Sequence, residues 1–278
     1  MSLASFNVHC GVDGWGRPFD VVAGCAALDA DVLVLQETWT PDGGAPGLAE
    51  LVAGRLGYER LEVGLAHGRL AHGRLADADP GATDRWGPPV RHRHDTLRLD
   101  GPRPGRVRSS PERPATSGTW GLALLTRVPA TRPGCTDLGR LPKDPARRAV
   151  LQVTVTVAGR PVTVFGTHMS HLLQRSPVQY RRLRAVLPTP DRAAVLAGDM
   201  NLWGPAVCTL LPGWRRAVRG RSWPSNRPHS QLDHVLVTPP VSVVSSGVGP
   251  SSGSDHRPVL AAITVGSGSD ELSPGTDR

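Results

Sequence analysis

Short apolar runs recur along the whole chain, and they constrain the fold more than any other feature of the sequence. They lie at residues 3–8, 31–36, 58–63, 120–126, 149–157, 162–167, 193–197, 231–237, 241–248 and 259–265. Runs of this length, rich in valine, leucine and threonine, are typical of β-strands. None approaches the roughly 18 uninterrupted apolar residues that a membrane helix needs, so we expect no transmembrane segment.

A smaller number of helices is predicted between these strands. Apolar periodicity predicts helices over residues 18–30 and 47–56, and Ser176 followed by Pro177 begins a basic helix that runs to about residue 187. Residues 158–160 predict a hairpin turn between two β-branched runs. Strands that outnumber helices in this way favour an α/β sandwich over a regular alternation of strand and helix.

Residues 64–117 interrupt the pattern. Glycine, proline and arginine dominate there, and the pentamer Leu-Ala-His-Gly-Arg occurs at 65–69 and again at 70–74. Ten arginines against six acidic residues supply half of the net charge of +8. We therefore expect a flexible inserted loop at 64–117 within one domain spanning residues 1–265, and a disordered polar tail at 266–278.

The charge and the cysteines restrict the function only loosely. A net charge of +8 favours a polyanionic partner such as nucleic acid or a phosphorylated substrate. However, 31 of the 32 basic residues are arginine, a bias that a GC-rich coding sequence also produces. The four cysteines are widely separated, form no Cys-x-x-Cys and follow no export signal, so we expect reduced thiols and a cytoplasmic protein.

Carboxylate, amide and imidazole groups lie next to five of the predicted strands. They are Glu37, His168, Asp199 with Asn201, Asp233, and Asp255 with His256. Each cluster alone is explained by a strand cap or a turn, but the same event five times is not. Hydrolysis at phosphorus needs such a set, because carboxylates bind Mg²⁺, a base activates water and donors stabilise phosphate oxygens.

The order of these segments resembles the endonuclease/exonuclease/phosphatase superfamily, which includes exonuclease III, deoxyribonuclease I and bacterial sphingomyelinases. The matching segments are Ser5-Phe6-Asn7, Leu35-Gln36-Glu37, residues 120–127, residues 166–169 with Arg175 and Gln179, and residues 198–201, 232–234 and 254–258. They cover nearly the whole chain outside the insertion and the tail. The resemblance implies a four-layer α/β sandwich of two packed mixed β-sheets flanked by helices.

The resemblance also implies a metal site. Glu37 would be the principal ligand of Mg²⁺, or of Mn²⁺ in its place, with Asn7 near it and Asp255 helping to hold or position the ion. These ligands offer hard oxygen atoms, and we expect no cysteine in the site.

The remaining motif residues would act on water and phosphate. Asp199 would deprotonate the attacking water, and Asn201 would hydrogen-bond the scissile phosphate. His256, oriented by Asp233, would stabilise or protonate the phosphate oxygens, while His168 would contact the phosphate from the other side.

Other polar and aromatic residues are expected to be structural. This applies to His234 and to His9, His67, His72, His92, His94, His171 and His229. Trp203 either stacks on a base or packs in the interior, and packing is the expected role. Residues 223–228 resemble an aromatic-proline turn that is structural in the family.

Three functions remain open from the sequence. The first is a Mg²⁺-dependent phosphodiesterase, most readily a nuclease, since a basic surface suits a phosphate backbone. The second is a phosphatase or phospholipase-C-like enzyme acting on a small phosphorylated metabolite or a lipid head group. The third is an inactive binding scaffold, and retention of the motif residues argues against it.

Overall fold

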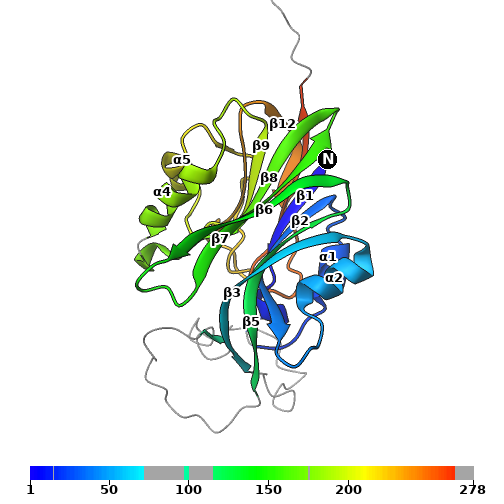
Figure 1. The fold of residues 1–278 in the computed structure, drawn as a ribbon, viewed down its shortest axis with the longest axis vertical. Helices are drawn as coiled ribbons and strands as arrows, with labels where there is room; N and C mark the ends of the chain where they lie inside the picture. The colour runs from blue at the N-terminus through cyan, green and yellow to red at the C-terminus, as the bar shows by residue number, and fades with distance from the viewer. Residues whose placement is uncertain (15, 72–96, 100–114, 175, 267–278) are drawn as a thin grey trace, which may run out of the picture.

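Two β-sheets packed face to face form the centre of the computed structural model, which describes residues 1–14, 16–71, 97–99, 115–174 and 176–266 (Figure 1). In spatial order, the first sheet contains β12 (Val241–Val248), β13 (Val259–Val265), β1 (Ser2–Asn7), β2 (Val32–Pro41), β5 (Ala115–Thr126), β3 (Glu59–Ala71) and β4 (Leu97–Leu99). The second contains β10 (Arg215–Arg216), β11 (Asp233–Val237), β9 (Ala194–Asp199), β8 (Arg160–His168), β7 (Arg147–Val157) and β6 (Ala130–Arg140). One pair in each sheet, β1 with β2 and β8 with β9, is parallel, and the others are antiparallel. The predicted pair of mixed sheets is confirmed.

Short helices cover the two outer faces. Helices α1 (Val21–Ala26) and α2 (Leu48–Leu56) lie on the first sheet, and α4 (Ser176–Val186) and α5 (Ala206–Leu210) lie on the second (Figure 1). Two 3₁₀ turns, His9–Gly11 and Leu172–Gln174, complete the helical elements of the described chain. No described helix is long and apolar enough to cross a bilayer.

The main core lies between the sheets. In β13, residues 259, 261, 263 and 265 are buried and alternate with half-buried positions, which is the two-residue period of a strand with one face on a core. At Gly166 in β8 the sheets approach so closely that a Cβ atom would lie 2.8 Å from Val34 Cγ1. Glycine is required there because no side chain fits between the sheets.

Several elements differ from the sequence-based prediction. The helix expected over 18–30 is reduced to Val21–Ala26, and the Asp20 carboxylate caps it by accepting a hydrogen bond from the Ala23 N–H. Strand β6 and helix α5 were not predicted. Most residues of β6 are exposed or half-buried, so this strand has no apolar periodicity by which to recognise it.

The boundaries of the expected insertion at 64–117 are also wrong. Strand β3 continues to Ala71, β5 begins at Ala115, and these two residues are register partners. Leu65 and Leu70 are each 3% exposed within the core between the sheets. The flanks of the segment are thus paired strands, while residues 72–96, 100–114 and 267–278 lie outside the described residues.

Removing the whole of 64–117 should damage the fold, whereas removing only its centre should not. The longer deletion loses Leu65 and Leu70, and a buried leucine contributes about 2–5 kcal/mol. Joining Ala71 to Ala115 by a four-residue Gly-Ser turn keeps both leucines and the strand pairing. In thermal melts followed by circular dichroism, the second variant should stay within a few degrees of wild type and the first should melt far lower. Equal melting temperatures would contradict these strand ends.

Candidate active site

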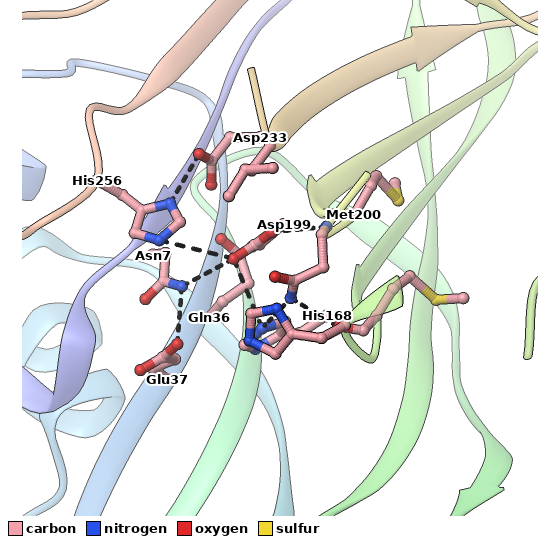
Figure 2. A network of polar contacts seen from close by, with 12 residues as sticks. Asn7, Gln36, Glu37, His168, Asp199, Met200, Asp233 and His256 are labelled. Atoms are coloured by element: carbon pink, nitrogen blue, oxygen red, sulfur yellow. Dashed lines mark hydrogen bonds and ion pairs between the residues drawn. The ribbon is translucent and has the colours of Figure 1, made fainter. Parts of the chain in front are cut away.

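Strands from both sheets bring their polar ends together (Figure 2). Asn7 is the last residue of β1, and Glu37 lies in the neighbouring strand β2. His168 ends β8 and is the register partner of Asp199, which ends the parallel strand β9. Asp233 begins β11, which is antiparallel to β9, and it also pairs with Asp199. The topology therefore gathers at one edge residues that are far apart in the sequence.

Asp199 lies at the centre of this cluster and is 1% exposed. Its Oδ2 accepts a hydrogen bond from Asn7 Nδ2 at 3.1 Å, and its Oδ1 accepts one from the Asn201 backbone N–H at 2.8 Å. Two imidazole nitrogens approach Oδ2 from different sides, His168 Nε2 at 3.6 Å and His256 Nε2 at 3.8 Å (Figure 2). One carboxylate oxygen is thus within reach of three nitrogen atoms.

Burial raises the pKa of Asp199 from 3.8 to about 7. The neighbouring negative charge of Asp233 acts in the same direction, and Glu37 adds a smaller effect, while His256 and the Asn201 N–H oppose them. Desolvation and like charge both penalise the ionised form. In the metal-free protein this carboxyl group is therefore poised to exchange a proton near neutral pH.

His256 forms a buried pair with Asp233. Its Nδ1 lies 2.8 Å from Asp233 Oδ2, and both side chains are fully buried. Burial opposes the charge on the imidazole, but Asp233 and then Asp255 outweigh it and raise the pKa of His256 to about 10. The imidazolium gives one N–H to Asp233 and leaves Nε2–H on the side of Asp199.

Glu37 reaches the cluster through a β-bulge. The register of β2 against β5 shifts after Gln36, and Glu37 has a φ of 57°. Asn7 Nδ2 donates to Glu37 Oε1 at 3.0 Å, while Asn7 Oδ1 accepts from the His9 backbone N–H at 3.0 Å. Gln36 instead hydrogen-bonds Ser5 within the sheet. Because of the bulge, the adjacent side chains of Gln36 and Glu37 point in different directions.

Asn201 fixes the orientation of His168. Its Nδ2 donates to the Met169 carbonyl oxygen at 2.8 Å and contacts His168 Nε2 at 3.2 Å. An amide nitrogen only donates, so His168 Nε2 is the acceptor in this contact. The φ of 48° at Asn201 is a left-handed conformation that asparagine tolerates.

Asp255 lies at the rim of the site, against two residues that the sequence did not single out for function. Its Oδ2 accepts a hydrogen bond from Trp223 Nε1 at 3.3 Å, and its Oδ1 lies 3.7 Å from His9 Nδ1. The Trp223 ring is also 6.5 Å from that of His256. No feature of the sequence distinguished His9 or Trp223 from packing residues.

Cys10 is closer to the site than expected. Burial raises the pKa of its thiol well above the usual range, and the charges of Glu37 and Asp255 raise it further. The Cys10 thiol is thus within electrostatic reach of two carboxylates of the site. Its thiol stays protonated at neutral pH, and only a thiolate is a good metal ligand.

A buried ion pair supports His168 from behind. Arg148 Nε donates to Asp144 Oδ2 at 2.8 Å, and the Ser170 hydroxyl hydrogen-bonds the same carboxylate. The Arg148 guanidinium lies 5.0 Å above the Trp120 ring, whose centroid is 5.1 Å from that of His168. In the sequence, only the arginines that precede the apolar run of β7 indicated this group of side chains behind His168.

The remaining predicted residues fall outside the cluster. His234 is fully buried and its Nε2 contacts the Leu202 carbonyl oxygen at 2.9 Å. Burial lowers its pKa to about 4, as suits a packing role. Trp203 is 55% exposed, so the expectation that it packs in the interior is wrong. Arg175 lies outside the described residues, and Gln179 Oε1 accepts a hydrogen bond from the Ser170 N–H.

The family assignment follows from comparison with known proteins. The sequence model of the endonuclease/exonuclease/phosphatase family matches residues 4–256. This chain belongs to that family, whose members are hydrolases acting on phosphate esters. The resemblance noted in the sequence is thereby confirmed. No curated protein is similar enough in sequence to count as a relative.

Solved structures share the fold. An endonuclease/exonuclease/phosphatase from Beutenbergia cavernae superposes with a TM-score of 0.62 at 23% identity, covering 96% of this chain and 72% of that one. An AP endonuclease from Archaeoglobus fulgidus gives 0.56 at 18% identity, with coverage of 95% and 100%. A mannosyl-6-phosphatase from Bacteroides thetaiotaomicron gives 0.55 at 13% identity, with coverage of 95% and 99%. At these identities the likeness concerns the fold alone.

The metal-free protein should lose stability as the pH rises. The folded state holds protons to a higher pH than the unfolded chain, from 6.5 to about 10 at His256 and from 3.8 to about 7 at Asp199. The His256 contribution is therefore complete below pH 6.5 and lost as the pH approaches 10, while that of Asp199 is lost between 3.8 and about 7.

Urea unfolding in EDTA at about pH 6.5 and about pH 9.5 measures the contribution of His256 to the free energy of unfolding. The loss of unfolding free energy should be on the order of 3 kcal/mol greater in wild type than in the double variant Asp233→Asn, His256→Gln, whose pair does not titrate. An equal loss in the two proteins would contradict the assigned ionisation of His256.

Proposed function

We propose that this protein is a Mg²⁺-dependent phosphodiesterase that cleaves nucleic acid by attack of an activated water. The observation that carries the proposal is the position of Asp199, a buried carboxylate with His168 and His256 on different sides of Oδ2. A base flanked by two groups that can contact phosphate is the arrangement that hydrolysis at phosphorus requires.

The oxygen donors beside Asn7 fit a hard cation. Glu37 and Asp255 both raise the pKa of the Cys10 thiol, so both carboxylates lie near that side chain. We propose that these two carboxylates hold Mg²⁺, with Asn7 alongside, and Mn²⁺ fits the same donors. When bound, the ion supplies positive charge that offsets the charge developing on the phosphate.

A second group of side chains is also close enough together to hold a metal ion, but it includes a histidine. Ligand atoms of Asp199, Asp233 and His256 lie within 4.8 Å of one another. The raised pKa of His256 keeps its imidazole protonated, and a metal binds only the neutral form. We therefore propose that this trio works by hydrogen bonding and proton transfer rather than as the metal site.

We propose Asp199 as the general base. Its pKa of about 7 in the metal-free protein matches the requirement that a base accept a proton near the working pH. The hydrogen bond from Asn7 Nδ2 fixes the Oδ2 atom in place. That atom is the one that faces both histidines, so we place the attacking water beside it.

We propose His256, Asn201 and His168 as the groups that contact the phosphate. The imidazolium of His256 keeps its Nε2–H available while Asp233 holds Nδ1. Asn201 Nδ2 already contacts both the Met169 carbonyl and His168 Nε2, so it reaches the phosphate by giving up the His168 contact. His168 Nε2, released from Asn201, can then take up a proton and donate it in a hydrogen bond to the phosphate.

The charge distribution supports nucleic acid over a small phosphate ester. The protein carries a net charge of +8, and residues 201–232, between two segments of the site, contain five arginines and no acidic residue. A basic surface beside the site suits a polyanionic strand. The four cysteines form no disulfide, which suits the reducing cytoplasm that we propose as its location.

A hydrolysis panel tests this function. Plasmid, single-stranded DNA, RNA, a choline phospholipid, inositol phosphates and mannose 6-phosphate should be offered with Mg²⁺ or with excess EDTA. We expect cleavage of nucleic acid with Mg²⁺, none with EDTA, and a loss of at least about 10³-fold in Asp199→Asn. Asp137→Asn, which removes an exposed carboxylate on β6, should retain the wild-type rate. Full activity in EDTA, or turnover of only the lipid or sugar phosphates, would refute the proposal.

A double-mutant cycle tests whether Asp233 acts through His256. Asp233→Asn keeps the shape of the side chain but removes the charge that holds His256 as an imidazolium. We expect a fall in kcat of roughly 10²-fold with a smaller change in KM, and little further loss when His256→Ala is added. Strictly multiplicative losses would show that the two residues work independently and would shift the phosphate-stabilising role to His168.

A further inference from the structure

The segment between Asn201 and Asp233, two residues of the site, is rich in positive charge. Its arginines are Arg215, Arg216, Arg219, Arg221 and Arg227. No aspartate or glutamate occurs from residue 201 to residue 232 to balance them. Like charges crowded along one short segment favour an anionic partner.

Part of this segment lines a hollow of about 400 Å³. Its walls include Trp203, Arg216, Arg221, His229 and Gln231. Trp203 is 55% exposed, whereas the buried tryptophans of the cores are at most 6% exposed. An open indole ring next to two guanidinium groups offers a flat apolar face and positive charge to the same ligand.

The hollow adjoins the candidate active site. Trp203 follows Asn201 by two residues, and Gln231 precedes Asp233 by two. On its other side, the His229 and Trp223 rings form a T-shaped pair with 5.2 Å between their centroids, and the Trp223 centroid lies 6.5 Å from that of His256. The rings of His229, in the wall of the hollow, and of Trp223 behind it therefore connect the hollow to His256.

The arginines of the hollow are available to a ligand. Among the described residues, neither Arg216 nor Arg221 forms an ion pair. Arg216 Nη1 donates to Gln231 Oε1 at 3.1 Å, which positions its guanidinium while leaving other N–H groups for an anion. Gly204 lies on the same wall, where a Cβ atom would come within 3.2 Å of Arg216 Nη1. The absence of a side chain at 204 thus leaves room for this arginine.

We propose that this hollow binds the nucleotide next to the scissile phosphate, with its base stacked on Trp203 and its phosphate held by Arg216 and Arg221. The inference rests on the proposed function and adds the place and chemistry of a substrate contact. Stacking on an aromatic ring is tolerant of base identity, and arginine matches phosphate geometry. Because the face of a base is accessible only when it is unstacked, the site selects an unpaired strand over a duplex.

Binding measured without turnover tests the subsite directly. An oligothymidylate of about 12 nucleotides with a fluorescent label should be titrated in EDTA into the Asp199→Asn protein. Adding Trp203→Ala should weaken binding about tenfold, and Trp203→Phe should restore most of it. Arg221→Ala should weaken binding. It should also make the negative slope of the logarithm of the binding constant against the logarithm of the salt concentration shallower by about 0.7. Arg55→Ala, on the exposed side of α2, is the matched control and should bind as the parent does.

Two further ligands identify what the hollow recognises. An oligomer with abasic sites should bind the parent protein as weakly as the normal oligomer binds Trp203→Ala. Duplex DNA of the same length should bind more weakly than the single strand. If vesicles of choline and anionic phospholipid lose affinity in Trp203→Ala while the oligomer does not, the pocket recognises a lipid and the proposal is wrong.

The outcomes separate this inference from the proposed function. Trp203-dependent binding of the oligomer by a protein that hydrolyses no nucleic acid would support the subsite and refute the function. Cleavage of nucleic acid with unchanged affinity and KM in Trp203→Ala and Arg221→Ala would support the function and refute the subsite. Melting curves of both variants should match the parent, because each altered side chain is exposed.

Discussion

A carboxylate buried between two β-sheets has to be surrounded by partners, and Asp199 sets this requirement for the whole site. An isolated buried charge is costly, so the fold has to supply donors from several directions. Asn7 comes from the first sheet, while the Asn201 N–H and His256 come from the end of β9 and the loop before β13. The site therefore depends on both sheets keeping their register and their separation.

That register depends on backbone features as much as on side chains. Gly198, directly before Asp199, has a φ of 153°, and a Cβ atom there would collide with the Thr167 carbonyl oxygen of the parallel strand β8. Glycine thus allows β9 to approach β8 at the point where His168 and Asp199 become neighbours. The bulge at Glu37 has the complementary effect in the first sheet, because it turns a carboxylate toward Asn7.

The sequence predicted the parts of the molecule that depend on apolar periodicity. The strands at 149–157 and 259–265 were recognisable in the sequence because one face of each packs in the core. The polar residues that follow the strands lie close together because neighbouring strands end at the same edge. Strand β6 escaped prediction because few of its side chains are buried. The contacts of His9 and Trp223 with Asp255 escaped for another reason, since they join segments more than 30 residues apart and leave no local pattern.

Buried Glu37, Asp199 and Asp233 form an acidic floor of the site, whereas arginines line the hollow next to it. Burial, and after it the negative charge of Asp233 with a smaller effect of Glu37, raises the pKa of Asp199 to about 7. Such a floor favours a cation and, alone, would repel a phosphate ester. Arg216 and Arg221 line the neighbouring hollow with Trp203, where they can meet a polyanion. Under the proposed function, these arginines would attract the substrate, while the buried carboxylates would hold the metal and activate the water.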